Sequence, residues 1–560
     1  MLRIAVLTPV VALVVAAAPV AAADPTEARL ALRTAEALYA DIRTTQLANG
    51  LRVYLKPIRG STAVTTMVVY KVGSGDEDKT VTGLSHYLEH LMFKGTVQLK
   101  PGDIDRLTFR AGGSNNAYTS TDLTAYHFTM PAGRWQEALA VEADRMRNLR
   151  VDRAHEFDKE KGAVINELTG NEDRPWELES KALLPLLFGS KHPYGHPVIG
   201  EEKHVRDATE TVIKDYYDRW YYPNNAALVM VGGFDADEAL KTIERLFGPL
   251  PAGKLPARKT VPAEPVKLPV RKEMASKFSV PRLLVAYPAA AAGDRDQAAL
   301  AVLDGLLGRG KRSRLYRTMV EGAAVASSAS SDYTPGRFGG WFGFYVDVLP
   351  GKDRPAAEKL LLEQVADLRD KPVSAGELHR VQQQLLAAAI FSREGTFGLA
   401  NSIGEAVTVT SLDFARQYLP SLLAVTPTDV QRVAKKYLDA ERSVTIWSVP
   451  PAKKTGLAAA RRAAAESIGW PAPIGRRRRR STWRKARARC CAERAGAGAV
   501  RGSPAADRAG ARQSAPGRHL PERRPGAWRA LTAAARRGDD ARTGRARSPR
   551  RSRTLADSWR

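Results

Sequence analysis

The sequence predicts an α+β fold made of two repeats, each a mostly antiparallel sheet covered by helices. Three observations support this prediction. Segments rich in β-branched and aromatic residues alternate with long helical segments between about residues 45 and 450. A segment with five prolines, 251–270, interrupts this pattern and predicts a linker. The same order of elements then returns, so that 209–231 and 426–449 each predict a tyrosine-bearing helix, a short turn and an apolar strand.

The first 23 residues have the pattern of a secretory signal peptide. Arg3 precedes an almost wholly apolar run, 4–20, and three alanines at 21–23 offer small residues for cleavage. The run is short for a membrane span. We therefore expect cleavage after Ala23, no stable membrane anchor, and a periplasmic or secreted protein. The alternative is an uncleaved anchor, which the small residues before Asp24 disfavour.

The first repeat is predicted to span 24–250, and the second 271–450. In the first, turn signals and β-rich segments predict strands at 51–55, 63–72, two within 114–130, and 226–231. Its predicted helices are 27–42, a short one after Pro101, 135–149, 154–168 and 208–221. In the second repeat we expect strands at 283–287, 338–348 and 443–449, and helices at 297–307, 356–368, 376–391 and 428–438. We expect the two repeats to face each other across a cleft.

The segment 83–93 carries an HxxEH motif, with His86, Glu89 and His90. On a helix, positions i and i+4 lie on one face, so the two imidazoles can reach one metal ion, and Glu89 projects beside them. Leucines with the spacing of a buried stripe occupy the opposite side: Leu84, Leu88 and Leu91. A chance match to this motif is expected in about one chain in a hundred of this length and histidine content, so the motif alone is not sufficient.

A catalytic zinc usually has three protein ligands, and Glu167 is the candidate for the third. It follows His90 after 76 intervening residues, within a predicted helix. Glu160 lies seven residues earlier, which is two helical turns, so the two carboxylates share one face.

With the motif and the downstream glutamate together, the sequence resembles the pitrilysin (insulinase) family of zinc metallopeptidases, as a bacterial two-repeat subunit similar to the processing peptidases. The resemblance implies one Zn²⁺ per chain, with His86, His90 and Glu167 as ligands. It also implies Glu89 as the general base that acts on a zinc-bound water, and Glu160 as a carboxylate that orients a ligand. The activity that follows is a zinc-dependent endopeptidase for short or unfolded peptides. This ligand set suits zinc best, although manganese or cobalt could also bind.

The resemblance also implies residues that hold the peptide. In this family an N-A-x-T segment forms an edge strand that pairs with the substrate backbone. Here Asn116 and Ala117 would hold the peptide, and Tyr118 would line a side-chain pocket. The alternative for this segment is an ordinary sheet strand.

A second family feature is an Arg and a Tyr near the metal, supplied by the second half or by a partner subunit. The corresponding region here, 308–317, contains Arg314, but no tyrosine follows at the expected distance, and Tyr333 is the nearest later candidate. We therefore expect a second homologous subunit with an Arg/Tyr pair to complete the site. The alternative is a monomer or homodimer that uses Arg314 or Tyr333.

The second repeat is expected to bind no metal and to line the cleft on the side opposite the first repeat. It has no counterpart of the HxxEH helix, and alignment of the repeats places Val381 opposite Glu160 and Ala388 opposite Glu167. In the first repeat, His192 and His196 lie in a Pro-flanked loop, where histidines are more commonly structural than ligands.

The residues 451–560 differ in composition from the rest. They hold 30 Lys and Arg against 7 Asp and Glu, which accounts for 23 of the net charge of +26, and both cysteines, Cys490 and Cys491. The preceding residues are thus near neutral and need no disulfide. This composition predicts disorder. A basic arm for nucleic acid is one interpretation, but 27 of the 30 basic residues are Arg, and we favour out-of-frame translation of GC-rich DNA.

Two rival functions remain beside the peptidase. One is a non-catalytic peptide-binding or structural subunit of the same fold, which the complete set of motif residues disfavours. The other is a basic nucleic-acid-binding protein, which depends only on the tail and conflicts with export. We therefore expect a peptide substrate and no nucleic acid.

Overall fold

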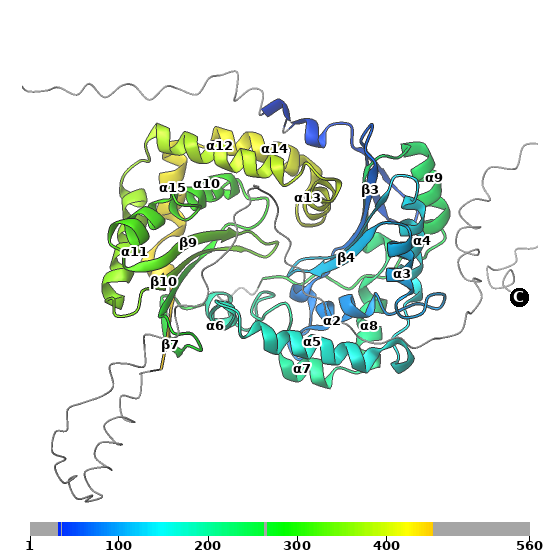
Figure 1. Cartoon of the computed structure of the whole chain (residues 1–560), viewed down its shortest axis with the longest axis horizontal. Helices are drawn as coiled ribbons and strands as arrows, with labels where there is room; N and C mark the ends of the chain where they lie inside the picture. The colour runs from blue at the N-terminus through cyan, green and yellow to red at the C-terminus, as the bar shows by residue number, and fades with distance from the viewer. Residues whose placement is uncertain (1–31, 35, 262–265, 452–560) are drawn as a thin grey trace, which may run out of the picture. The chain divides into compact units, whose positions relative to one another are not determined.

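Two β-sheets organise the computed structural model, which describes residues 32–34, 36–261 and 266–451 (Figure 1). These residues all belong to one compact unit. We call the residues around the first sheet, 36–250, the first half, and those around the second sheet, 270–451, the second half.

The first sheet has six strands in the order β1-β2-β6-β3-β5-β4. All neighbours are antiparallel except β2 and β6, which are parallel. The strands are β1 (Arg43–Gln46), β2 (Arg52–Pro57), β3 (Ala63–Tyr70), β4 (Ser114–Thr119), β5 (Thr124–Pro131) and β6 (Ala226–Gly232). Strand β4 forms one edge, so its outer side has no neighbour in the sheet.

The second sheet repeats this topology with five strands in the order β7-β11-β8-β10-β9. Its parallel pair is β7 and β11, and the other neighbours are antiparallel. The strands are β7 (Val270–Ala275), β8 (Arg282–Ala289), β9 (Ala326–Thr334), β10 (Gly340–Val348) and β11 (Val444–Val449). Together the two sheets and their helices confirm the predicted α+β fold with two similar halves.

Helices cover both sheets. Those of the first half are α2 (Leu84–Leu91), α3 (Asp103–Arg110), α4 (Trp135–Asn148), α5 (Phe157–Asn171), α6 (Glu177–Phe188), α7 (Glu202–Asp207), α8 (Glu210–Trp220) and α9 (Ala236–Phe247). Those of the second half are α10 (Gln297–Leu307), α11 (Arg354–Asp370), α12 (Ala375–Phe391), α13 (Thr396–Val409), α14 (Leu412–Ala424) and α15 (Pro427–Tyr437), besides a π-helical turn at Tyr316–Gly322. In Figure 1, α4 and α9 lie beside the first sheet, and their apolar side chains join its core.

The central strand β6 explains how the sheet is buried on both faces. All seven of its residues are buried. Leu228 and Met230 pack with α4, α8 and α9 on one face, whereas Val229 and Val231 pack with α13 on the other. Successive side chains of a strand point to opposite faces. A strand that is covered on both faces therefore appears in the sequence as the unbroken apolar run at 226–231.

One helix of each half packs on the sheet of the other half. Helix α13, with Leu399, Ala400 and Ile403, covers the free face of the first sheet. Helix α6, with Leu183 and Leu187, packs on β8 and β11 of the second sheet. Because each sheet is completed by the other half, the halves are joined by apolar burial in addition to the connecting chain.

The sequence patterns missed several elements. The elements that were not expected are the helices α6, α7, α9, α13 and α14 and the strands β1, β7 and β9. The predicted linker 251–270 ends at the first residue of β7. Part of that segment packs on the first half, where Asn224 exchanges hydrogen bonds with the backbone of Gly253. The predicted signal peptide and the tail beyond Pro451 lie outside the described residues, and the predicted domain boundaries stay a prediction. Within the part of the chain that is described, no helix is long and apolar enough to cross a bilayer.

Candidate metal centre

The HxxEH motif lies on α2, which is buried along one side. Leu84, Leu88 and Leu91 are almost completely buried in the core of the first half, as the leucine spacing predicts. The helix begins after Gly83, whose φ is 90°. Glycine is favoured in this left-handed region, and an added Cβ would lie 2.6 Å from the carbonyl oxygen of Ile199. The start of the motif helix thus depends on a residue without a side chain.

Helix α5 packs against α2 and carries both of the predicted carboxylates. The Tyr87 hydroxyl on α2 donates a 2.6 Å hydrogen bond to the carbonyl of Phe157, the first residue of α5, and the two rings lie 5.3 Å apart. Two turns separate Glu160 from Glu167 on this helix. The contact at Phe157 therefore fixes where both carboxylates stand relative to the histidines.

The side chains of His86, His90 and Glu167 converge. Glu167 Oε2 lies 3.7 Å from His86 Nε2 and 3.6 Å from His90 Nε2, and one donor atom from each residue falls within 4.8 Å of the others. Two ligand atoms of a tetrahedral zinc ion, at about 2.0–2.1 Å from it, are about 3.3–3.4 Å apart. The donor atoms are therefore close to the spacing that zinc requires, and their types suit zinc. Among the described residues, this is the group of His, Cys, Asp or Glu side chains that could hold a metal ion.

The surroundings of His86 suit a neutral imidazole donor, and those of His90 hold its ring in place. Burial, and then the neighbouring His90, lower the pKa of His86 to about 4, so its imidazole is neutral near pH 7. His90 Nδ1 lies 3.3 Å from Glu160 Oε2, and Lys94 Nζ lies 3.0 Å from Glu160 Oε1. Burial alone would raise the pKa of Glu160, but the hydrogen bonds from His90 and Lys94 lower it. Glu160 thus stays ionised and can orient the His90 ring, which leaves Nε2 of that ring facing Glu167.

Glu89 lies beside this group and is held from the edge strand. Its side chain is 9% exposed, and Thr119 at the end of β4 donates a 2.6 Å hydrogen bond to Oε2. Burial raises the pKa of Glu89, although the Thr119 hydrogen bond lowers it in part. A carboxylate with a raised pKa is a stronger base than a free one. The contact also connects the motif helix directly to the sheet edge.

The N-A-x-T segment forms the edge strand β4. The backbone N–H of Ala117 donates to Oδ1 of its neighbour Asn116 at 2.9 Å, and the strand pairs with β5 on one side only. The Tyr118 side chain turns to α13, where its hydroxyl donates to Asn401 Oδ1 at 2.8 Å and lies 3.3 Å from Glu405 Oε1. Tyr118 therefore meets the second half at this face of the strand.

The structure does not bring Arg314 and Tyr333 to the histidines. Arg314 forms a bidentate ion pair with Glu377 and donates one further hydrogen bond to Asp367. Both carboxylates lie on helices of the second half. Tyr333 is buried in the core of that half, and its hydroxyl donates to the carbonyl of Ala290. The loop histidines also have other partners: His192 Nδ1 accepts from the Tyr194 N–H, and His196 Nδ1 lies 3.1 Å from the Pro197 carbonyl.

Several residues around the site were missed by the sequence patterns. They are Asp76, Glu77, Lys94, Thr119 and Arg337. Lys94 lies three residues beyond the end of α2, so no helical spacing connects it with His90. Glu77 contacts Gly83 and Ser85, six and eight residues away, whereas Asp76, Thr119 and Arg337 make contacts between segments far apart in the chain, which no local pattern signals.

Comparisons with known proteins agree with this fold. A family model described as "Insulinase (Peptidase family M16)" matches residues 52–200, and one described as "Peptidase M16 inactive domain" matches residues 207–385. Both models describe domains of one peptidase family, and together they match parts of both halves. The chain belongs to peptidase family M16, the insulinase or pitrilysin family, in which curated relatives are named zinc proteases.

Individual relatives cover the two halves together. The zinc protease PqqE of Helicobacter pylori is 28% identical over 72% of this chain and 92% of its own length. The uncharacterized zinc protease SCO5738 of Streptomyces coelicolor is 27% identical over 72% of this chain and 89% of its own. Among solved structures, a protease from Helicobacter pylori matches with a TM-score of 0.68 and 26% identity, over 73% of this chain and 99% of that one. The periplasmic protease PqqL from Escherichia coli, at 21% identity, shares the fold with a TM-score of 0.62, over 79% of this chain and 52% of that one.

Proposed function

We propose that the chain is a zinc-dependent endopeptidase that hydrolyses short or unfolded peptides. The observation that carries the proposal is the convergence of His86, His90 and Glu167 beside Glu89, which the edge strand holds through Thr119. A metal-binding group, a buried carboxylate and an open strand edge thus meet at one place. A metallopeptidase that binds its substrate by strand addition uses these three components.

The residues of the chain have distinct tasks in this reaction. His86, His90 and Glu167 would hold one zinc ion per chain, and Glu160 would fix the ring of His90. When bound, zinc supplies Lewis acidity that lowers the pKa of water toward about 7 and polarises a peptide carbonyl. Glu89 accepts a proton from the attacking water and returns it to the leaving amine. Its hydrogen bond from Thr119 occupies one oxygen, Oε2, and leaves Oε1 for the proton.

The peptide would bind by adding a strand to β4. Strand addition uses backbone groups for affinity and alternate side chains for selectivity. The outer side of β4 has no neighbour in the sheet, and the strand ends at Thr119, which donates a hydrogen bond to Glu89. A peptide paired with β4 would therefore pass the carboxylate. A folded protein does not offer a free strand of this kind, which supports a preference for short or unfolded substrates.

A second homologous subunit that carries an Arg/Tyr pair would complete the site, with a homodimer as the alternative. The ion pairs of Arg314 and the buried position of Tyr333 support this proposal, because both side chains already serve the packing of the second half. We also propose that the protein is exported, on the basis of the predicted signal peptide.

The experiment compares the full-length protein with its Glu89→Gln variant. Zinc content is measured by mass spectrometry, and cleavage is followed with a quenched peptide library, alone and after mixing with any co-encoded homologue. We expect zinc in both proteins and loss of cleavage in Glu89→Gln by about 100-fold or more, since a general base contributes about that factor. Zinc without cleavage in any mixture would support a non-catalytic peptide-binding subunit instead.

A further inference from the structure

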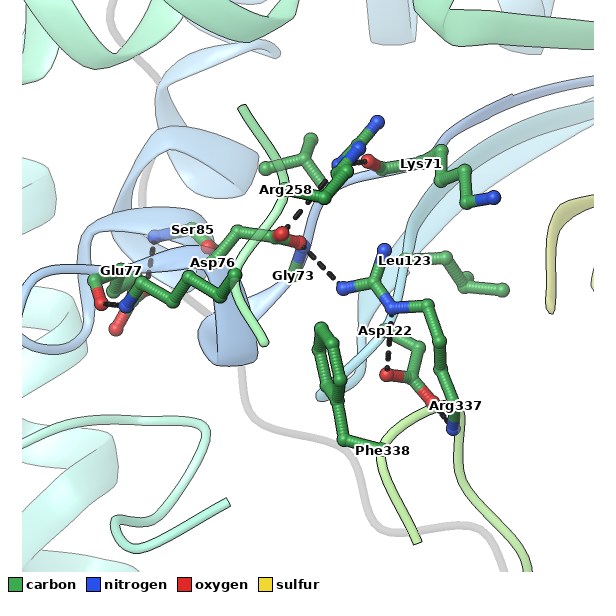
Figure 2. A network of polar contacts seen from close by, with 12 residues as sticks. Lys71, Gly73, Asp76, Glu77, Ser85, Asp122, Leu123, Arg258, Arg337 and Phe338 are labelled. Carbon is green, nitrogen blue, oxygen red and sulfur yellow. Dashed lines mark hydrogen bonds and ion pairs between the residues drawn. The ribbon is translucent and has the colours of Figure 1, made fainter. Parts of the chain in front are cut away.

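Two adjacent carboxylates, Asp76 and Glu77, lie in the loop between β3 and the motif helix (Figure 2). Both are buried. They bind different partners: Glu77 contacts the start of α2, whereas Asp76 contacts arginines from distant parts of the chain. The loop thus stands between the metal-binding helix and the second half.

Glu77 holds the N-terminus of α2. Its Oε2 accepts a 2.7 Å hydrogen bond from the N–H of Gly83, and its Oε1 accepts a 2.6 Å bond from the N–H of Ser85. The first N–H groups of a helix have no partner within it, and the two oxygens of Glu77 accept hydrogen bonds from the N–H groups at this end. Ser85 directly precedes His86. The hydrogen bonds from Glu77 therefore fix the start of α2 and, with it, the position of His86.

Asp76 is fixed mainly by arginine. Its side chain is 1% exposed, and Oδ2 lies 2.9 Å from Nη2 of Arg337 and accepts from the N–H of Gly73 at 3.2 Å. Arg258, in the predicted linker, lies 3.4 Å from Oδ1 and donates to the carbonyl of Lys71 at 2.6 Å. A buried carboxylate needs such partners to remain ionised.

Arg337 comes from the turn between β9 and β10 of the second half and contacts two loops of the first half. Besides Asp76, it reaches Asp122 in the turn that follows the edge strand β4: its backbone N–H donates to Oδ2 at 2.9 Å, and Nε of its guanidinium lies 3.5 Å from Oδ1 as an ion pair. The Tyr194 hydroxyl donates to the same carboxylate at 2.6 Å. One arginine therefore contacts both the loop before the metal-binding helix and the turn after the peptide-binding strand, as Figure 2 shows.

The two loops also touch directly, since the N–H groups of Ser74 and Gly75 donate to the carbonyls of Ser120 and Thr121. Two buried aspartates at this junction repel each other unless a cation lies between them. Loss of the Arg337 guanidinium would leave Arg258 beside Asp76 and, among the described residues, no cationic side chain paired with Asp122. The junction would loosen, and α2 would shift relative to β4.

We propose that Arg337 is a positioning residue, through which the second half sets the distance between the zinc-binding helix and the peptide-binding strand. This inference rests on the proposed peptidase function. It assigns the second half a part in catalysis that needs no metal ligand and no contact with substrate. Arg337 acts on the reaction through Asp76 and Glu77 on one side and through Asp122 on the other.

The test compares full-length Arg337→Gln with wild type. Loss of a residue that orients metal ligands typically costs about 10- to 100-fold in metal affinity or activity. We expect zinc affinity, measured by competition with a chelator, and kcat for a peptide each to fall about ten-fold. Hydrogen exchange of the amides in 84–91 should accelerate. Arg337→Lys, which keeps the charge, should recover part of both losses.

The matched control is Arg432→Gln. Arg432 forms a 2.6 Å ion pair with the buried Asp296 inside the second half, so this variant also removes an arginine from a buried aspartate. It should leave zinc affinity and kcat unchanged. If Arg337→Gln lowers the melting temperature as Arg432→Gln does but leaves zinc affinity and kcat at wild-type values, Arg337 serves stability alone and the proposal is wrong.

A double variant separates positioning from general destabilisation. If Arg337 acts through Asp76, then Arg337→Gln with Asp76→Asn should lose no more zinc affinity than the more damaging single variant, because coupled residues are not additive. Additive losses would contradict the proposed route. A wild-type chain that binds no zinc would instead overturn the proposed function, so the two failures are distinguishable.

Discussion

The two halves have sheets of the same strand order but use the helices beside them differently. In the first half, α2 and α5 meet with histidines and glutamates at their contact, and the side chains of His86, His90 and Glu167 are 14%, 24% and 40% exposed. In the second half, α10 and α12 meet through apolar residues. Val381 of α12, which aligns with Glu160, is fully buried, and its Cγ1 would lie 2.4 Å from a Cβ added at Gly305 of α10.

The difference is that a helix pair with metal-binding side chains at its contact has less apolar packing there. Nine of the eleven residues of α10 are buried, so this helix contributes mainly to the core. Helix α2 has only eight residues, keeps one side partly open, and needs Glu77 and Gly83 to fix its start. The first half has less apolar packing at this position and carries the candidate metal centre, whereas the second half keeps the packing.

Removal of a metal ligand should produce the largest change. Glu167→Ala takes away one of three donors, and we expect peptide cleavage to fall to about 1% of wild type or less, together with zinc content. The side chain is 40% exposed, so the thermal stability of the metal-free protein should change little. Glu244→Ala, at an exposed position of α9, is the control for loss of a helical glutamate. Full activity in Glu167→Ala would exclude this residue as a ligand.

The aligned positions Glu160 and Val381 allow a direct comparison of the halves. Glu160→Ala should lower zinc affinity about 10- to 100-fold, because His90 loses the carboxylate that orients it. Val381→Ala should lower the free energy of unfolding by about 2 kcal/mol, because it leaves a cavity in the core. Chelator competition and urea unfolding measure the two effects. The comparison fails if Val381→Ala changes zinc affinity as much as Glu160→Ala does.

The smallest expected effect is the pH dependence of the stability that Asp296 contributes in the second half. Burial alone would raise the pKa of Asp296, but hydrogen bonds from Lys436, Arg432 and Tyr437 lower it to about 2. A carboxylate with a lowered pKa stabilises the fold above its unfolded value, near pH 4, and this contribution disappears as the pH falls toward 2. Asp296→Asn should therefore cost about 2 kcal/mol at pH 7. Urea unfolding at pH 7 and near pH 2.5 should show the difference between variant and wild type shrinking; a constant difference would contradict the assignment.

Much of the fold follows from local patterns in the sequence. Helix α2 could be predicted because its leucine stripe and its HxxEH spacing lie within two turns, and β6 because burial on both faces gives an unbroken apolar run. Helix α13 was missed, since it covers the sheet of the other half and its pattern does not show where its apolar face packs.

In the candidate site, too, some residues could be predicted from the sequence and others could not. The convergence of the histidines with Glu167 was predicted from spacing and family resemblance, and Arg314 and Tyr333 were chosen by analogy of position. The structure shows that the latter two side chains are held within the second half. Arg337 could not be predicted, because its partners Asp76 and Asp122 lie more than 200 residues away in the chain. Contacts of this kind depend on the completed fold.

The most direct test of the central claim is native mass spectrometry of the purified full-length chain, beside Glu167→Ala. If His86, His90 and Glu167 form the metal centre, the wild-type chain carries one zinc ion and the variant has lost it, while Glu244→Ala keeps it. A zinc-free wild-type chain, or zinc retained in Glu167→Ala at the wild-type level, would contradict the account.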